Sequence, residues 1–269
     1  MGVAYVMKRY AFLVSVFGLC VSPLVVGEEA SKPKRAKVEV PVQTTEEALN
    51  KLELPGVTIN AKERFVDVEA EVCLDGGALE LVVCTKDSKE HESILSIEAK
   101  PVHIHMALLL VGAKAGHPAH QKAIGEGEEK RWMFIPARGQ SINVSLLTKD
   151  EQGKLLEKPI ADFIRHIEDE SAFIEELNTG KRPEEKKFPT SSFLFVGSHL
   201  VDAGEGKPRR YIAGESGNVI SISTFGDEML GLSETFGHVN GSLVWEIDDE
   251  VLPKKGTKVT MRLRPKFKE

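Results

Sequence analysis

The sequence predicts a strand-rich α+β fold built on antiparallel sheets. Apolar and charged residues alternate along "FVDVEAEV" at 65–72, and similar alternation runs along 91–99 and 140–148, as is typical of strands with one buried face. Two further segments, at about 101–113 and about 160–178, have the apolar content and spacing of helices. These patterns together predict sheets that pack with one buried helix and one amphipathic helix.

Glycine-rich turns are expected to join the strands. The run "LDGG" at 74–77 is a turn signal, and "ALELVVC" at 78–84 then returns as a strand, which predicts a hairpin with 65–72. Between about 191 and 265, short strand-like runs are separated by Gly, Pro and Asp signals.

The two helices differ in how they should pack. The first begins at Pro101, a residue suited to a first helical turn, and is apolar nearly all round, so we expect it to be buried. The second, at about 160–178, lies between Pro159 and Gly180 and carries an apolar stripe along one side. It is therefore predicted to be amphipathic.

The N-terminus has the pattern of an export signal. Lys8 and Arg9 precede an uncharged run at 10–26, which predicts a cleaved signal peptide over 1–27. An uncleaved anchor is the alternative, but this run is shorter than the roughly 20 apolar residues of a spanning helix. The charged, proline-bearing segment at 28–43 is predicted to be a disordered linker, and 44–269 a single domain in the periplasm or at the cell exterior.

The acidic charge balance limits the partners. Removal of Lys8 and Arg9 with the signal would change the net charge from −6 to −8, which argues against a nucleic acid or an anionic membrane as partner. Membrane contact is expected only transiently, through the signal segment. The partner is therefore expected to be a protein or a small-molecule ligand.

The stretch "KEHESILSIEAKPVHIH" at 89–105 is the first candidate for chemistry. Histidine and glutamate are metal-ligand and acid–base residue types. On the predicted helix, the two C-terminal histidines would lie about 200° apart around the axis and point nearly opposite ways, which favours structural histidines. The candidate motif comprises His91, Glu92, Ser93, His103 and His105.

A metal site would need other partners for this motif. If the strand at 91–99 leads into a helix that folds back along the sheet, the histidines of that helix lie far from His91 and Glu92. The residues that return beside this pair are those after the helix. A divalent metal, if bound, is thus expected at His91, Glu92, His117 and His120.

The mature chain would keep Cys73 and Cys84, which could form a disulfide in an oxidising compartment. The alternatives are two buried thiols or a redox pair. Across the predicted hairpin Cys73 would face about Ala78 or Leu79 rather than Cys84. Two cysteines cannot supply a four-thiolate iron–sulfur cluster, and no cofactor is expected other than a divalent metal.

Several stretches resemble the YdjY-domain proteins, a family of exported bacterial proteins of unassigned biochemical role. The similarity lies in "KEHES", "HIHMALLLVGAKAG", "YIAGESGNVISISTFGDEML" and "LVWEIDDEVLPKKGTKVTMRLRP". It covers about 54–265 and implies export, one continuous domain and no established chemistry. Some relatives are described as ferredoxin-like, but this chain lacks the cysteine run that an iron–sulfur cluster requires.

Three function classes follow. The sequence favours a non-catalytic exported binding or assembly module, because it carries no nucleophile signature. The alternatives are a metal-binding protein or metal-dependent hydrolase that uses the His/Glu cluster, and a redox accessory that uses the two cysteines.

Overall fold

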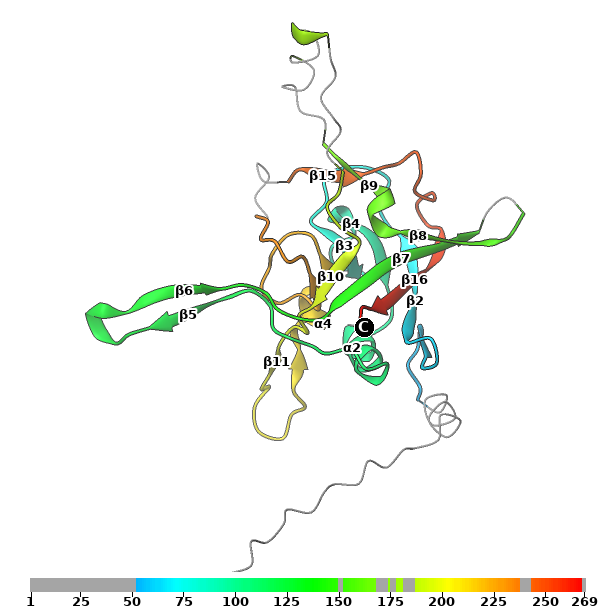
Figure 1. Ribbon diagram of the computed structural model, residues 1–269. Coiled ribbons are helices and arrows are strands. Elements are labelled where there is room, and N and C mark those ends of the chain that lie inside the picture. Colours follow the sequence, from blue (N-terminus) through cyan, green and yellow to red (C-terminus); the bar gives the residue numbers. More distant parts are fainter. Residues whose placement is uncertain are drawn as a thin grey trace, which may run out of the picture. The chain divides into compact units, whose positions relative to one another are not determined.

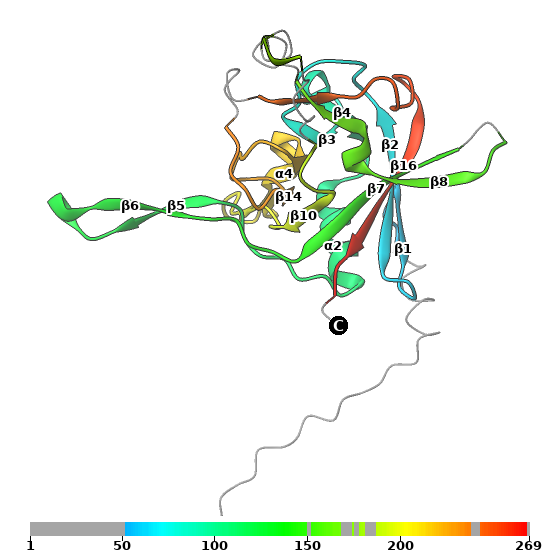
Figure 2. The same ribbon diagram turned by 45° about the horizontal axis from the view of Figure 1, so that its top comes forward.

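The computed structural model describes residues 52–149, 152–167, 174, 178–180, 187–237 and 243–267, which belong to one compact unit (Figures 1 and 2). The signal peptide predicted at 1–27 and the linker at 28–43 lie outside these residues. Within the described part, no helix has the length and apolar character needed to cross a membrane.

The fold is a closed β-barrel of eight strands. Each strand pairs with the next around the ring, and the pairing of β2 with β4 closes it. The β3–β4 and β13–β14 pairs are parallel and the other pairs are antiparallel. The strands, in order around the barrel, are β2 (Phe65–Val72), β16 (Lys258–Pro265), β7 (Ser141–Lys149), β10 (Ser192–Phe195), β14 (Leu230–Gly231), β13 (Asn218–Ser221), β3 (Leu81–Thr85) and β4 (Ser93–Ile97).

Shorter elements surround the barrel. Strand β1 extends the sheet beside β2 and β8 pairs with β7, while three two-stranded sheets are separate from it. These elements are β1 (Val57–Asn60), η1 (Glu90–Glu92), α2 (Pro101–Leu110), β5 (His120–Ile124), η2 (Gly127–Glu129), β6 (Arg131–Ile135), β8 (Leu155–Pro159), η3 (Ile160–Phe163), β9 (Ile164–His166), β11 (Leu200–Val201), β12 (Arg210–Tyr211), α4 (Ile212–Ser216) and β15 (Trp245–Ile247).

Alternating side chains explain the long strands of the barrel. In β2 the apolar residues Val66, Val68, Ala70 and Val72 are buried, and the acidic residues between them are more exposed. Strand β16 alternates in the same way. This period of two places one face of each strand in the core and the other in solvent.

A cross-strand ion pair joins these two strands on the outer face. Arg262 of β16 lies opposite Asp67 of β2 in the register. Its guanidinium donates two hydrogen bonds of 2.8 Å to the Asp67 carboxylate and stacks 3.9 Å above the Phe65 ring. The planar guanidinium makes such two-point contacts more specific than a lysine could.

Strands β3 and β4 are buried on both faces. All of β4 and residues 81–84 of β3 are buried, and the two strands run parallel. Parallel strands are commonly covered on both sides and read as continuous apolar runs, as "LVVC" does here.

The α+β prediction is wrong, because the protein is mostly β and its sheet closes into a barrel. The predicted hairpin between 65–72 and 78–84 is also wrong: β4 lies between β2 and β3. Apolar alternation fixes which face of a strand is buried, but it does not say which strand lies alongside. The strand predicted at 140–148 is confirmed by β7.

The segment predicted as a buried helix at 101–113 forms α2, which ends at Leu110 and is buried on one side only. Pro101, Ile104, Ala107 and Leu108 are buried, whereas Met106, Leu109 and Leu110 are exposed. A helix that is apolar on all sides is therefore not buried on all sides here, and one apolar face of α2 is exposed to solvent.

The amphipathic helix predicted at 160–178 is wrong over its described N-terminal part. That part is the 3-10 turn η3 followed by the strand β9, which pairs with β15. Ile160, Phe163 and Ile164 are buried as the stripe requires, so a 3-10 turn satisfies the same spacing over one turn. Most of the remainder lies outside the described residues.

Substitution of Gly116 tests how closely the chain around this residue packs against β10. Its N–H donates to the Phe195 carbonyl over 2.8 Å, and a Cβ there would lie 1.9 Å from the Arg138 carbonyl oxygen. We expect Gly116→Ala to lower the free energy of unfolding by about 2–3 kcal/mol, or the melting temperature by roughly 5–10 °C. Gly76→Ala is the control, because its Cβ would meet nothing within 4 Å. Equal melting temperatures for the two variants would contradict this packing.

Candidate functional site

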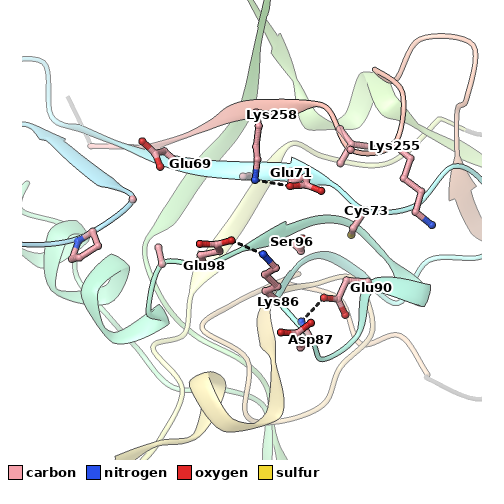
Figure 3. A pocket seen from close by; sticks show the side chains of 16 residues that line it. Glu69, Glu71, Cys73, Lys86, Asp87, Glu90, Ser96, Glu98, Lys255 and Lys258 are labelled. Atoms are coloured by element: carbon pink, nitrogen blue, oxygen red, sulfur yellow. Dashed lines mark hydrogen bonds and ion pairs between the residues drawn. The ribbon is translucent and has the colours of Figure 1, made fainter.

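A cleft of about 720 Å³ lies on the outer side of the barrel where β2 meets β4. Its walls come from β2, from the end of β4, from the segment at 86–90 and from the chain around 255–258 (Figure 3). The outward side chains of β2 and β16 supply part of the lining, because the inward positions of both strands fill the core.

Two lysine–glutamate pairs lie within the cleft. Lys258 Nζ is 2.5 Å from Glu71 Oε2, and Lys86 Nζ is 2.5 Å from Glu98 Oε1 (Figure 3). The hydrogen bond from Lys258 lowers the pKa of Glu71, and that from Lys86 lowers the pKa of Glu98. Both carboxylates are therefore ionised at neutral pH.

The cleft carries more negative than positive charge. Five carboxylates and three lysines line it. The Glu90 carboxylate accepts a hydrogen bond from the Asp87 N–H, while Glu69 and Lys255 have no ion-pair partner in the described part of the chain. A surplus of carboxylates in a concave site attracts a cationic group.

A pair of cysteines lies at the base of the cleft. Cys73 lines it together with Ser96, and Cys84 is fully buried behind. Both are free thiols. The Cys73 thiol is 3.1 Å from the Ser93 carbonyl oxygen, to which it donates.

The two cysteines lie on the chain segments that flank β4, one on each side of this strand. The Cys73 N–H, just beyond β2, donates to the Ile94 carbonyl over 3.0 Å, and Cys84 of β3 pairs with Ser96. The sequence placed both cysteines on one hairpin, and the intervening strand makes that wrong. The disulfide between them stays a prediction.

The two thiols interact electrostatically. A hydrogen bond with Cys73 lowers the pKa of the Cys84 thiol to about 7, against the opposing effect of burial. The same hydrogen bond, together with burial, raises the pKa of Cys73. The pKa of the Cys73 thiol therefore lies above that of the Cys84 thiol, and Cys84 loses its proton first.

The N-terminal half of the candidate motif lies on a separate turn. His91 belongs to η1, with a side chain that is 77% exposed and an Nε2 that is 3.6 Å from Glu92 Oε2. Ser93 begins β4 and is fully buried. None of these three residues lines the charged cleft, but Glu90, which directly precedes His91, does.

The C-terminal half of the motif lies on α2 itself. His105 Nδ1 is 2.8 Å from the Tyr211 hydroxyl, which itself donates to the Gly197 carbonyl over 3.1 Å. Since that hydroxyl has one proton, His105 Nδ1 is the donor. Burial lowers the pKa of His105, and its ring packs edge-on against Phe195. His103 has a buried Nδ1 without a described hydrogen bond.

His120 is the first residue of β5, and His117 lies three residues before it. Their ring centroids are 5.2 Å apart, and each Nδ1 is 3.0 Å from the Pro118 carbonyl oxygen. The described contacts join His91 with Glu92 and these two histidines with each other. Across the described residues, no group of three or more His, Cys, Asp or Glu side chains is arranged to hold a metal ion. The metal site predicted from all four residues stays a prediction, which elemental analysis of the purified protein tests.

A sequence model of the YdjY domain matches residues 57–264. The chain belongs to the YdjY-domain family. The charged cleft and both cysteines lie within or directly beside this YdjY domain. No curated protein and no solved structure matches the chain.

Sequence reasoning missed the charged residues of the cleft. None of the candidate residues predicted from the sequence is among the five that form its ion pairs or its outer wall, which are Glu69, Glu71, Lys86, Glu98 and Lys258. The signal was the outward face of β2, where acidic residues recur every second position next to an outward lysine of β16. That signal becomes specific only when the register places Lys258 opposite Glu71.

The thiol pair gives a titration test. In a Cys20→Ser background, thiolate absorbance at 240 nm is expected to rise with a midpoint near pH 7, from Cys84. Cys73→Ala removes the stabilising hydrogen bond, so we expect a higher midpoint. Cys84→Ala should abolish the transition. An unchanged midpoint in Cys73→Ala would contradict the assigned coupling.

Proposed function

We propose that this YdjY domain is an exported, non-catalytic binding module whose ligand occupies the charged cleft. The ligand class is a small molecule or peptide with at least one cationic group. The proposal rests on one observation, the surplus of carboxylates over lysines in a cleft of about 720 Å³. A volume of this size lies within the range of small-molecule sites.

The paired lysines support a defined ligand geometry. Lys86 and Lys258 neutralise Glu98 and Glu71, so those carboxylates are already satisfied. Of the other three carboxylates, Glu90 accepts the Asp87 N–H and Asp87 adjoins Lys86 in the chain. Glu69, on the exposed outer face of β2, has no ion-pair partner in the described part of the chain. An ammonium or guanidinium group would therefore bind at Glu69, and the flanking lysines would disfavour a second cationic group close by.

The test measures binding of two small probes by calorimetry at low and at physiological ionic strength. Spermidine supplies cationic groups and citrate supplies only carboxylates. We expect spermidine to bind and citrate not to bind. Added salt should weaken spermidine binding, because the interaction is between largely solvent-exposed charges.

Two matched variants decide where spermidine binds. Glu69→Gln keeps the size of the side chain and removes its charge, and should weaken binding about tenfold, as expected for a charge-assisted hydrogen bond. Glu205→Gln removes a carboxylate that is also exposed but lies outside the cleft, and should have no effect. Equal binding by both variants and the unaltered protein, or tighter binding of citrate, would rule out the proposed site.

A further inference from the structure

Strands β5 and β6 form an arm that is separate from the barrel sheet. They pair only with each other among the described strands, from His120 opposite Ile135 to Ile124 opposite Arg131. All five residues of β5 are exposed. Both views show the arm extending away from the barrel strands (Figures 1 and 2).

The arm exposes large apolar side chains. Trp132 is 62% exposed, Phe134 50%, Ile124 48% and Met133 43%. Two-stranded hairpins are at best marginally stable alone in water, and clustered apolar exposure marks interaction surfaces. The arm therefore has the properties of a surface that another protein covers.

The register places the two aromatic rings on one face. Trp132 lies opposite Ala123, and Phe134 lies opposite Gln121. Directly opposite residues in an antiparallel pair point to the same side. Small or polar neighbours on β5 thus leave the Phe134 ring uncovered, and the Trp132 ring has Lys130 Nζ 5.0 Å from its centroid.

The two outer edges of the arm differ in charge. Lys122 is the central residue of β5, so pairing of this edge with its own copy would place two ammonium groups opposite each other. Met133 is the central residue of β6, and the only charge on that strand is Arg131 at its end. In the described part of the chain no strand pairs with this outer edge of β6.

We propose that β6 pairs in antiparallel fashion with β6 of a second copy, with Met133 on the two-fold axis. Trp132 of each copy then lies opposite Phe134 of the other, which gives two aromatic cross-strand pairs on one face. Arg131 lies opposite Ile135 of the other copy, so no like charges meet. The two hairpins become one four-stranded sheet, a form of β-strand addition.

The expected interface is small. A buried aromatic side chain covers about 150–250 Å², so half-exposed side chains and a five-residue edge give on the order of 500 Å² per copy, below the roughly 800 Å² of a standard interface. We therefore expect reversible dimerisation in the micromolar range, which acts independently of the cleft.

Variants with one introduced cysteine test the register, because the native Cys73 and Cys84 are buried. At the two-fold position, opposite Cα atoms lie about 4.5–5.5 Å apart, which is within disulfide reach. Under mild oxidation Met133→Cys is expected to form a covalent dimer. Lys122→Cys, at the equally exposed centre of β5, should stay monomeric. Cross-linking at both positions to the same extent, or at neither, overturns the proposal.

Sedimentation over a concentration series provides a second readout in the full chain. Trp132→Lys with Phe134→Lys should lower the dimer fraction at least tenfold, while Leu200→Lys, an exposed apolar residue outside the arm, should leave it unchanged. Circular dichroism checks that each variant keeps its fold. Sedimentation as a monomer at every concentration would also overturn the second-copy assignment.

Discussion

The pairing of β2 with β4 is the constraint on which the rest of the structure depends. It spans only two residue pairs, Glu71 with Ser96 and Val72 with Leu95, and the Cys73 amide adds a hydrogen bond to Ile94. Without it the sheet would be open, with edges at β4 and at β1 and the end of β2, and such unpaired edges attract other strands. Because the ring closes, the inward residues of all eight strands share one core.

The pairing that closes the barrel also determines where the charged cleft lies. The short pairing of β2 with β4, called the seam below, leaves the outward side chains on both sides of it free to line a cleft. Strand β16 contributes Lys258 to this cleft, and the segment after β3 contributes Lys86. The cysteines flank β4 because β2 and β3 both pair with that strand. The charge pattern of the cleft and the contact between the thiols therefore have a common origin in the seam.

The sequence predicted the local features better than the long-range ones. Strand alternation in 65–72 and 140–148 and the proline start of α2 depend on neighbouring residues, and the structure agrees at each. Barrel closure depends on pairings between residues far apart, such as Arg262 with Asp67, which no local pattern encodes. The motif that holds three of the eight histidines is divided between η1 and α2, while the cleft is lined by lysines and glutamates that look like ordinary surface residues in the sequence.

Hydrogen exchange at the seam tests barrel closure most directly. If β2 and β4 close the ring, the Cys73 amide, bonded to Ile94 over 3.0 Å, should exchange as slowly as the amides between β7 and β16, since strands of one cooperative core open together. Amides of the β5–β6 arm should exchange much faster. If the Cys73 amide exchanges at the rate of the arm, the sheet is open between β2 and β4, and the account of the cleft fails with it.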